Sequence, residues 1–96
     1  MTNDMNNSEI NGAGTRFWRN SNDQYHRENG PAIELIDGWK YWYINGEYHR
    51  EGGPAVEEPN GNKFWYKYGK RHREDGPAIV IVNGPELWFL EGRKIL

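Results

Sequence analysis

The 96-residue chain contains no cysteine and no long apolar run. Without cysteine there can be no disulfide framework, no thiolate metal ligand and no thiol nucleophile, which is typical of proteins of the reducing cytoplasm. Every apolar stretch is far shorter than the roughly 20 residues of a membrane-spanning helix, and none resembles a signal peptide. We therefore expect a soluble, cytoplasmic protein that does not enter a membrane.

A strong excess of either charge is also missing. The formal net charge is −2, and residues 15–96 hold twelve basic and twelve acidic side chains. Nucleic-acid-binding domains usually carry a clear basic excess, so this balance disfavours nucleic acid as the partner. Aliphatic residues are few, whereas aromatic residues make up 15% of the chain. Because a small domain has a thin core, we expect Trp, Tyr and Phe to form it.

Repetition is the dominant feature of the chain. The phrase His-Arg-Glu-x-Gly-Pro-Ala occurs three times at a spacing of 23 residues, at 26–32, 49–55 and 72–78. A fixed period of this size indicates a repeat architecture, in which an atypical terminal unit serves as a cap. The sequence predicts a tail over residues 1–9 and a single β-repeat domain over residues 10–96. The domain is divided into a partial unit (10–25) and three full units (26–48, 49–71 and 72–96).

Each full unit is predicted to contain two strands joined by a tight turn. In the first full unit the strands are expected at Ile33–Ile36 and Lys40–Ile44, with Asp37-Gly38 between them. Asp-Gly and Asn-Gly between apolar segments favour a type I′ hairpin, whose two central residues need positive φ. The same pattern gives strands at Val56–Glu58, Lys63–Tyr68, Ile79–Val82 and Glu86–Leu90. The expected fold is all-β, an antiparallel meander of stacked β-hairpins in an elongated, twisted sheet.

Side chains alternate between the two faces of a strand, which separates two aromatic columns. Tyr41 and Tyr43 face one way and Trp42 faces the other, and the later units repeat this arrangement. A single-layer sheet cannot bury both faces, so one column should stay partly exposed and provide binding anchors. We expect the exposed column to be the tyrosine-rich one, because a phenol tolerates a wet surface better than an indole.

The repeated His-Arg-Glu invites three interpretations. Equivalent histidines in a stacked sheet would lie about 10 Å apart, too far to share one zinc ion. A catalytic site is normally unique, whereas this group occurs three times without a recurring nucleophile. We therefore predict no catalytic residue, no metal ligand and no cofactor. The favoured interpretation is structural: Arg and Glu pair between neighbouring units, and His or acidic side chains bind free backbone groups of the loop.

The segment from Lys67 to Arg73 is the most basic in the chain and surrounds Tyr68. It can contact phosphate or an acidic partner surface, or it can simply be a solvated turn, which its adjacent acidic residues favour. Together with the aromatic column it supplies the candidate binding residues. These are Tyr41, Tyr43, Tyr66, Tyr68, Lys70, Arg71, Arg50 and Arg73.

The combination of Trp-Tyr-x-x-Gly with His-Arg-Glu-x-Gly-Pro-Ala resembles the MORN-variant repeats of small bacterial and phage proteins, over about residues 15–96. The resemblance implies stacked β-hairpins and a non-enzymatic scaffold that binds proteins. Because such repeats occur in phage proteins, it also implies a candidate role as an inhibitor of a host defence complex, comparable with anti-CRISPR proteins. The His-Arg-Glu phrase departs from the standard MORN pattern, which argues against a carried-over lipid function.

Two functions therefore stay open from the sequence. The first is a non-enzymatic protein-interaction module, whose partner could be a host defence complex in the host cytoplasm. The second is a binder of a nucleotide or another small anionic ligand, held by the aromatic and Arg/His columns. Open sheet edges also favour self-association.

Overall fold

The computed structural model describes residues 8–95, and all the secondary structure in this part of the chain is β. Most of the predicted tail, residues 1–7, lies outside the described residues. Ser8 and Glu9 were also assigned to that tail, but they belong to a strand. No helix in the described part is long and apolar enough to cross a bilayer.

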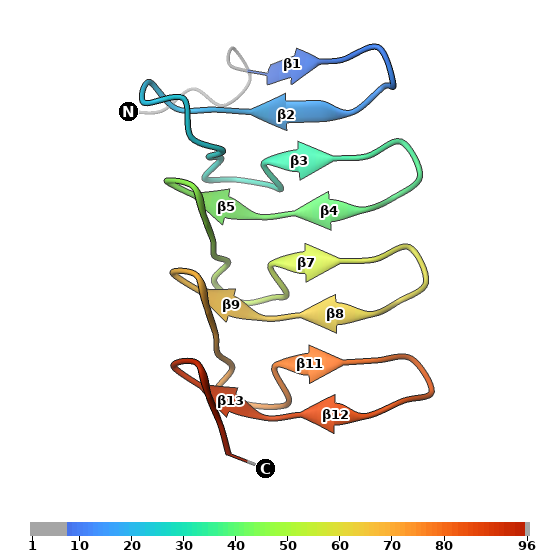
Figure 1. The fold of residues 1–96 in the computed structure, drawn as a ribbon, viewed down its shortest axis with the longest axis vertical. Coiled ribbons are helices and arrows are strands. Elements are labelled where there is room, and N and C mark those ends of the chain that lie inside the picture. The colour runs from blue at the N-terminus through green and yellow to red at the C-terminus, as the bar shows by residue number, and fades with distance from the viewer. Residues whose placement is uncertain (1–7, 96) are drawn as a thin grey trace.

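Eight strands form one open antiparallel sheet that runs along the molecule (Figure 1). Its spatial order is β1-β2-β3-β4-β7-β8-β11-β12, so each strand pairs with its predecessor and successor within this sheet. The predicted all-β meander of hairpins is thereby confirmed. The molecule measures 41 × 28 × 17 Å, an elongated shape. The strands are β1 (Ser8–Ile10), β2 (Arg16–Trp18), β3 (Ile33–Glu34), β4 (Lys40–Tyr41), β7 (Val56–Glu57), β8 (Lys63–Phe64), β11 (Ile79–Val80) and β12 (Glu86–Leu87).

Each full unit contains a second, smaller hairpin that the sequence did not predict. The long aromatic strand is interrupted at Trp42, Trp65 and Trp88, and the residues beyond each tryptophan leave the main sheet to pair with the segment that follows. The prediction of one continuous strand through each of these tryptophans was wrong. The small hairpins are β5 (Tyr43–Ile44) with β6 (Glu47–Tyr48), β9 (Tyr66–Lys67) with β10 (Lys70–Arg71), and β13 (Phe89–Leu90) with β14 (Arg93–Lys94).

The type I′ turns lie in the small hairpins, and not at the predicted Asp-Gly and Asn-Gly sites. Asn45 and Gly46 both have positive φ, 48° and 82°, as a two-residue type I′ turn requires. Tyr68-Gly69 and Glu91-Gly92 have the same geometry. At the predicted site Asp37-Gly38, only the glycine has positive φ, and Leu35 and Trp39 close a three-residue loop. The wider loop places the left-handed conformation on one residue only.

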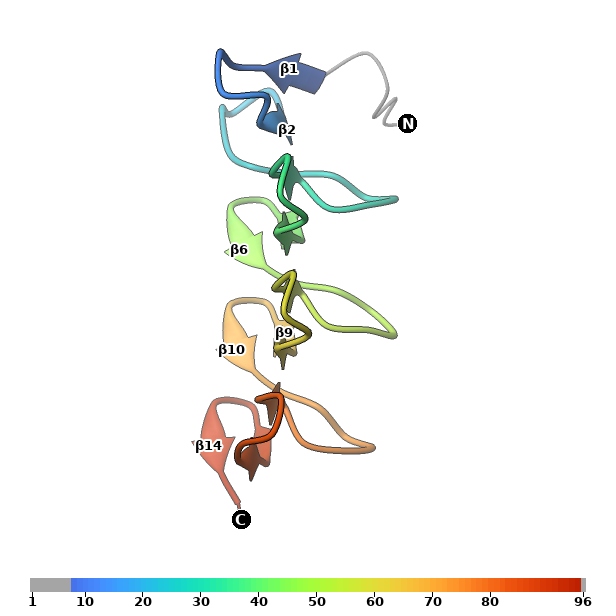
Figure 2. The same ribbon diagram turned by 90° about the vertical axis from the view of Figure 1, so that its right-hand side faces the viewer.

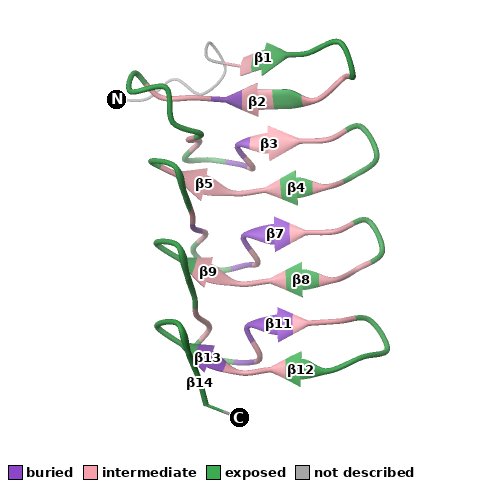
Figure 3. Ribbon diagram, viewed as in Figure 1, coloured by how far each residue is buried: buried purple, intermediate pink, exposed green. Residues whose placement is uncertain are grey.

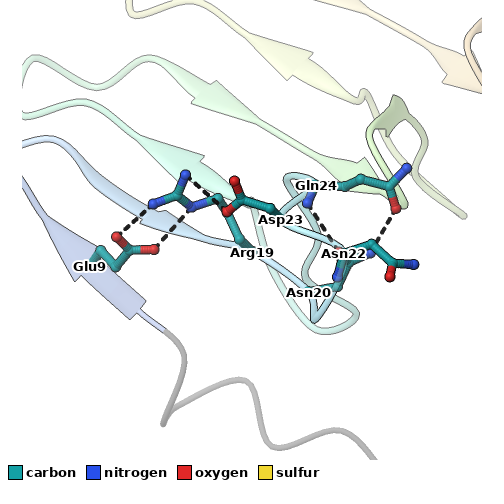
Figure 4. A network of polar contacts seen from close by, with 6 residues as sticks. All are labelled: Glu9, Arg19, Asn20, Asn22, Asp23 and Gln24. Atoms are coloured by element: carbon teal, nitrogen blue, oxygen red, sulfur yellow. Dashed lines mark hydrogen bonds and ion pairs between the residues drawn. The ribbon is translucent and has the colours of Figure 1, made fainter.

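The N-terminal unit is more complete than its sequence indicated. β1 pairs with β2, and Arg19 forms a bridge to Tyr25 where later units have a small hairpin. Figure 4 shows the polar network at this corner. Arg19 binds both carboxylate oxygens of Glu9, at 2.7 and 3.0 Å, and the Asn20 side chain accepts the backbone N–H of Gln24. These contacts stabilise the longer turn of this unit.

The interior is thin and lies between successive units (Figure 3). Ala32, Ala55 and Ala78 are completely buried, and Val56 and Ile79 are nearly so. Each buried alanine accepts a hydrogen bond from the backbone N–H of the tryptophan in the preceding unit, as Ala55 does from Trp42 at 2.6 Å. Small residues are required here because two backbones approach each other closely.

Candidate functional site

The three copies of the His-Arg-Glu-x-Gly-Pro-Ala phrase form loops that we call the junction loops (26–32, 49–55 and 72–78). Figure 2 shows loops at these places projecting from one side of the sheet, with β6, β10 and β14 on the other side. In the second junction loop, Arg50 lies over the Trp42 ring with its Cζ 3.9 Å from the ring centroid. Its Nη1 also donates a hydrogen bond to the Pro54 carbonyl at 3.1 Å. The guanidinium therefore joins one unit to the tryptophan of the unit before it.

The other two junction loops repeat this arrangement. Arg27 lies 3.8 Å from the Trp18 centroid and Arg73 lies 3.9 Å from the Trp65 centroid. A Cβ at Gly53 would come within 2.7 Å of the Arg50 Cζ, so the glycine leaves the space that the arginine fills. The same holds for Gly30 with Arg27 and Gly76 with Arg73.

The histidines hold the turns of the small hairpins. His49 Nδ1 accepts the backbone N–H of Tyr68 at 3.0 Å, and its Nε2 lies 3.1 Å from Glu51. Because Nδ1 is an acceptor, the neutral ring carries its proton on Nε2, the nitrogen that lies beside the Glu51 carboxylate. His26 accepts the Asn45 N–H and His72 accepts the Glu91 N–H in the same way.

The arginine–glutamate pairs lie within a unit, although the sequence predicted them between neighbours. Arg50 contacts Glu57 at 3.2 Å and Arg27 contacts Glu34 at 3.7 Å. The third unit has Val80 at the corresponding position, and Arg73 contacts Asp75 at 3.0 Å instead. The side chains of the junction loops thus have structural contacts in every unit, as the structural interpretation expected.

The predicted tyrosine column forms a continuous group of rings where the small hairpins meet the main sheet. Tyr43 and Tyr48 have centroids 4.6 Å apart, Tyr48 and Tyr66 are 5.0 Å apart, and Tyr41 lies 6.3 Å from Tyr48. Burial, followed by a side-chain hydrogen bond with Tyr48, raises the pKa of Tyr43. Burial likewise raises the pKa of Tyr41. These rings are half-buried, so the column acts mainly as packing between units.

The structure does not bring the eight predicted binding residues together. Tyr41, Tyr43 and Tyr66 belong to the ring group, and Arg50 and Arg73 are held against tryptophans. The remaining three lie near one another on the small hairpins. They are Tyr68, Lys70 and Arg71.

Lys70 and Arg71 belong to an exposed basic surface, which we call the basic strip, on the two C-terminal small hairpins, and Tyr68 lies beside it. None of its basic side chains makes an ion pair with another described residue, and Tyr68 beside them is 55% exposed. A hollow of about 310 Å³ lies here, lined by Lys67, Tyr68 and Lys70 together with His72, Glu74 and Glu91. The basic strip consists of Lys67, Lys70, Arg71, Arg93 and Lys94.

Three members of the basic strip, Lys67, Arg93 and Lys94, were not among the predicted binding residues. Counting in steps of 23 would have found Lys94, because Tyr25, Tyr48, Arg71 and Lys94 occupy one column. This column changes from aromatic to basic towards the C-terminus. Basic side chains therefore gather at one end of a stack whose basic and acidic side chains balance over its whole length.

No group of three or more described His, Asp or Glu residues is arranged to hold a metal ion. Comparisons with known protein families, curated proteins and solved structures find no match to this chain. The resemblance to MORN-variant repeats accordingly stays a prediction, as do the unit boundaries.

Proposed function

We propose that the protein is a non-enzymatic interaction module that binds an acidic surface of a protein partner through the basic strip. The observation that carries this proposal is that five exposed basic side chains, free of ion pairs with described residues, lie on the two C-terminal small hairpins. Two of them, Lys67 and Lys70, line a hollow together with the exposed ring of Tyr68. Aromatic and arginine side chains are favoured anchors at protein interfaces. Exposed bases of one sign also speed the encounter with an acidic partner.

The repeated chemistry of the junction loops supports a non-enzymatic role. His49 and Arg50 each have well-defined structural partners, and the corresponding residues of the other units have equivalent ones. A general base needs access to a substrate proton, whereas His49 is 7% exposed and directs Nδ1 at a backbone amide. A scaffold that differs between units mainly in its surface side chains is well suited to recognition.

The test is a charge reversal in the strip with a matched control elsewhere. Tagged wild-type protein and a Lys67→Glu/Lys70→Glu double variant capture partners from the native host, and each captured protein is then purified and its affinity measured. Each reversal removes one attraction and adds one repulsion, so we expect affinity to fall by roughly tenfold. Binding of the wild type should also weaken as salt increases.

Lys63→Glu is the control, because Lys63 is an exposed lysine of the main sheet and not a member of the strip. Since Lys63 lies opposite Glu57, circular dichroism first establishes that this variant is folded. The control variant changes net charge in the same direction, so a loss of binding in both variants would indicate a general charge effect. A partner that binds the double variant as well as the wild type would refute the proposal. Capture of nucleic acid instead of protein would also refute it.

Within this class of function, the resemblance to phage repeat proteins favours inhibition of a host defence complex. Plaque formation on a defended bacterial strain that expresses the wild-type chain would test this finer role. The wild type should raise plating efficiency, and the strip variant should not. Equal plating efficiency with the wild type and the strip variant would show that inhibition of the defence complex does not depend on the basic strip.

Binding of a nucleotide or a small anion is the alternative, and the groove between the second and third junction loops is where it would occur. This groove has a volume of about 400 Å³ and contains Arg50 and Arg73, but also Glu51, Glu74 and Asp75. The three carboxylates oppose an anion, and both arginines already stack on tryptophans. Thermal-shift measurements with nucleotides would distinguish the two functions, because nucleotide binding requires that the melting temperature of the protein rise.

A further inference from the structure

The main sheet ends at β12, whose outer edge has no partner strand among residues 8–95. Its counterparts β2, β4 and β8 each pair with strands on both sides. Strand edges that present free backbone groups are natural sites for an added strand. The three occupied edges show in detail what such an added strand must contain.

The first requirement is a small residue followed by an aliphatic one. Trp18, Trp42 and Trp65 donate their backbone N–H groups to Ala32, Ala55 and Ala78. The residue after each alanine then lies opposite a large ring, as Val56 lies opposite Tyr41. At the open edge, the corresponding positions are Trp88 and Leu87.

The second requirement concerns charge. The strands equivalent to β12 carry a base at their first position, and Arg16 and Lys40 lie opposite Glu34 and Glu57 of the next unit. In β12 this position is Glu86, which is exposed and makes no ion pair with a described residue. The sign of the edge is therefore reversed relative to the interior edges.

We propose that the β12 edge binds an extended strand of another protein in which a small residue, an aliphatic residue and a basic residue follow one another. The small residue's carbonyl accepts the Trp88 N–H, the aliphatic side chain lies opposite Leu87, and the basic side chain pairs with Glu86. This inference goes beyond the proposed function, because it uses a different surface from the basic strip.

Glu86 also makes the chain's own strands poor partners. β3 and β7 are paired on both sides, so the free edges that a second copy offers among its described residues are those of β1 and β12. β1 carries Glu9 and β12 carries Glu86, and neither strand supplies the basic residue of the pattern. Like charges directly across a strand pair are destabilising. The edge therefore discriminates against a second copy and in favour of a basic strand.

The test uses the full chain and two peptides of residues 76–84, one with Val80→Lys and one with Val80→Glu. Nuclear magnetic resonance of ¹⁵N-labelled protein follows the backbone amides during titration. We expect the largest chemical-shift changes at the backbone amides of Leu87 and Trp88. The lysine peptide should bind roughly three- to tenfold more tightly than the glutamate peptide. In the Glu86→Lys protein the order of the two peptides should be inverted.

Glu86→Gln provides the neutral control, and with it the two peptides should bind equally. Circular dichroism of each protein variant establishes that it is folded before it is titrated. The proposal is overturned if neither peptide shifts the edge amides, if the shifts lie elsewhere, or if Glu86→Lys keeps the original order. It is also overturned if light scattering shows that the wild type already pairs with a second copy through this edge.

Discussion

Gly52 and Gly53 are neighbours in one junction loop, yet they meet different physical requirements. Gly52 has a φ of 80° and open space around its Cα. Gly53 lacks such a φ but lies against the guanidinium of Arg50, which a Cβ would approach to 2.7 Å. One glycine is needed for its backbone conformation and the other for the stacking of Arg50 on Trp42.

Alanine substitutions separate the two requirements. Gly53→Ala should lower the free energy of unfolding by about 1–3 kcal/mol, because it displaces a packed side chain. Gly52→Ala should lower it by about 1–2 kcal/mol through left-handed strain. Urea titration would measure both, with Gly12→Ala as control, since Gly12 has nothing within 4 Å and no positive φ. Only Gly53→Ala should alter the fluorescence of the tryptophans, and equal spectra for the two loop variants would contradict this explanation.

Ionisation of Tyr43 should make stability depend on alkaline pH. Its pKa is raised in the folded state by burial and by Tyr48, whereas the unfolded chain ionises near its ordinary value of about 10. Above that pH the unfolded state loses a proton that the folded state retains, so stability must fall as pH rises. Below about pH 10 the two states hold the same proton and no dependence is expected.

Melting temperatures of the wild type and Tyr43→Phe between pH 8 and 11 would measure this effect. The phenylalanine variant should lose less stability than the wild type across the alkaline range. Tyr68→Phe is the matched control, because Tyr68 is an exposed tyrosine that lies outside the ring group. If the melting temperatures of the wild type and Tyr43→Phe fell equally between pH 8 and 11, the alkaline loss of stability could not be assigned to Tyr43.

Alternation along the strand correctly separated Trp42 from Tyr41 and Tyr43, because the period of a strand is a local property. The stacking of Arg50 on Trp42 could not be predicted in the same way, since it depends on how far a loop folds back over the preceding unit. The sequence therefore predicts Arg50 and Arg73 as binding residues without indicating that both stack on tryptophans.

The small hairpins illustrate how a turn can form without favourable turn residues. Asn45-Gly46 suits a type I′ turn, whereas Tyr68-Gly69 and Glu91-Gly92 place bulky residues at a positive φ. The latter two turns are nevertheless closed by hydrogen bonds to His49 and His72 from the preceding junction loops. Tertiary contacts thereby override local preference.

Glu91→Asn should stabilise the protein, because asparagine tolerates the left-handed conformation better than glutamate. We expect a gain of about 0.5–1 kcal/mol in the free energy of unfolding. The reciprocal change Asn45→Glu should be destabilising, and it also removes the Asn45 acceptor of the Asn20 side chain. Chemical denaturation of both variants tests the pair, and a destabilising Glu91→Asn would show that the glutamate side chain has another role.

The presence of β-hairpins was predictable from glycine spacing and period-two alternation, and so was their antiparallel order. The second hairpin of each unit has a turn signal only in the first full unit, at Asn45-Gly46, because the Tyr-Gly and Glu-Gly of the other two units carry no turn signal of their own. The break at Trp42 was hidden for a related reason: its backbone still forms hydrogen bonds, but to Ala55 and His49 rather than along one continuous ladder. A strand that changes partners looks uninterrupted in sequence.

Along the whole molecule, each unit contacts mainly the units next to it, as in other stacked architectures. Cross-strand pairs join β4 to β7 and β8 to β11 at equivalent positions, and the open sheet never returns to its first strand. Stability should therefore grow with the number of units, and an internal unit should be removable.

Deletion of residues 49–71 should give a folded, shorter and less stable protein. The joint then connects Tyr48 directly to His72, Arg73 takes the place of Arg50 over Trp42, and every later residue keeps its face of the sheet. Circular dichroism and urea titration should give a native-like spectrum with a lower midpoint and a smaller m-value. Deletion of residues 57–80 is the control, because its joint lies inside a strand of the main sheet, where a shift of one residue turns the following side chains of that strand to the opposite face and should lower the midpoint further.

The contact between Arg50 and Trp42 has a consequence for synthesis on the ribosome. Trp42 is made before Arg50, and Trp18 and Trp65 likewise precede the arginines that cover them. Each new junction loop thus meets a tryptophan surface that has already emerged, so no early segment needs to wait for a distant late one. The nascent chain can be assembled vectorially, one loop at a time, with only the newest tryptophan uncovered at any moment.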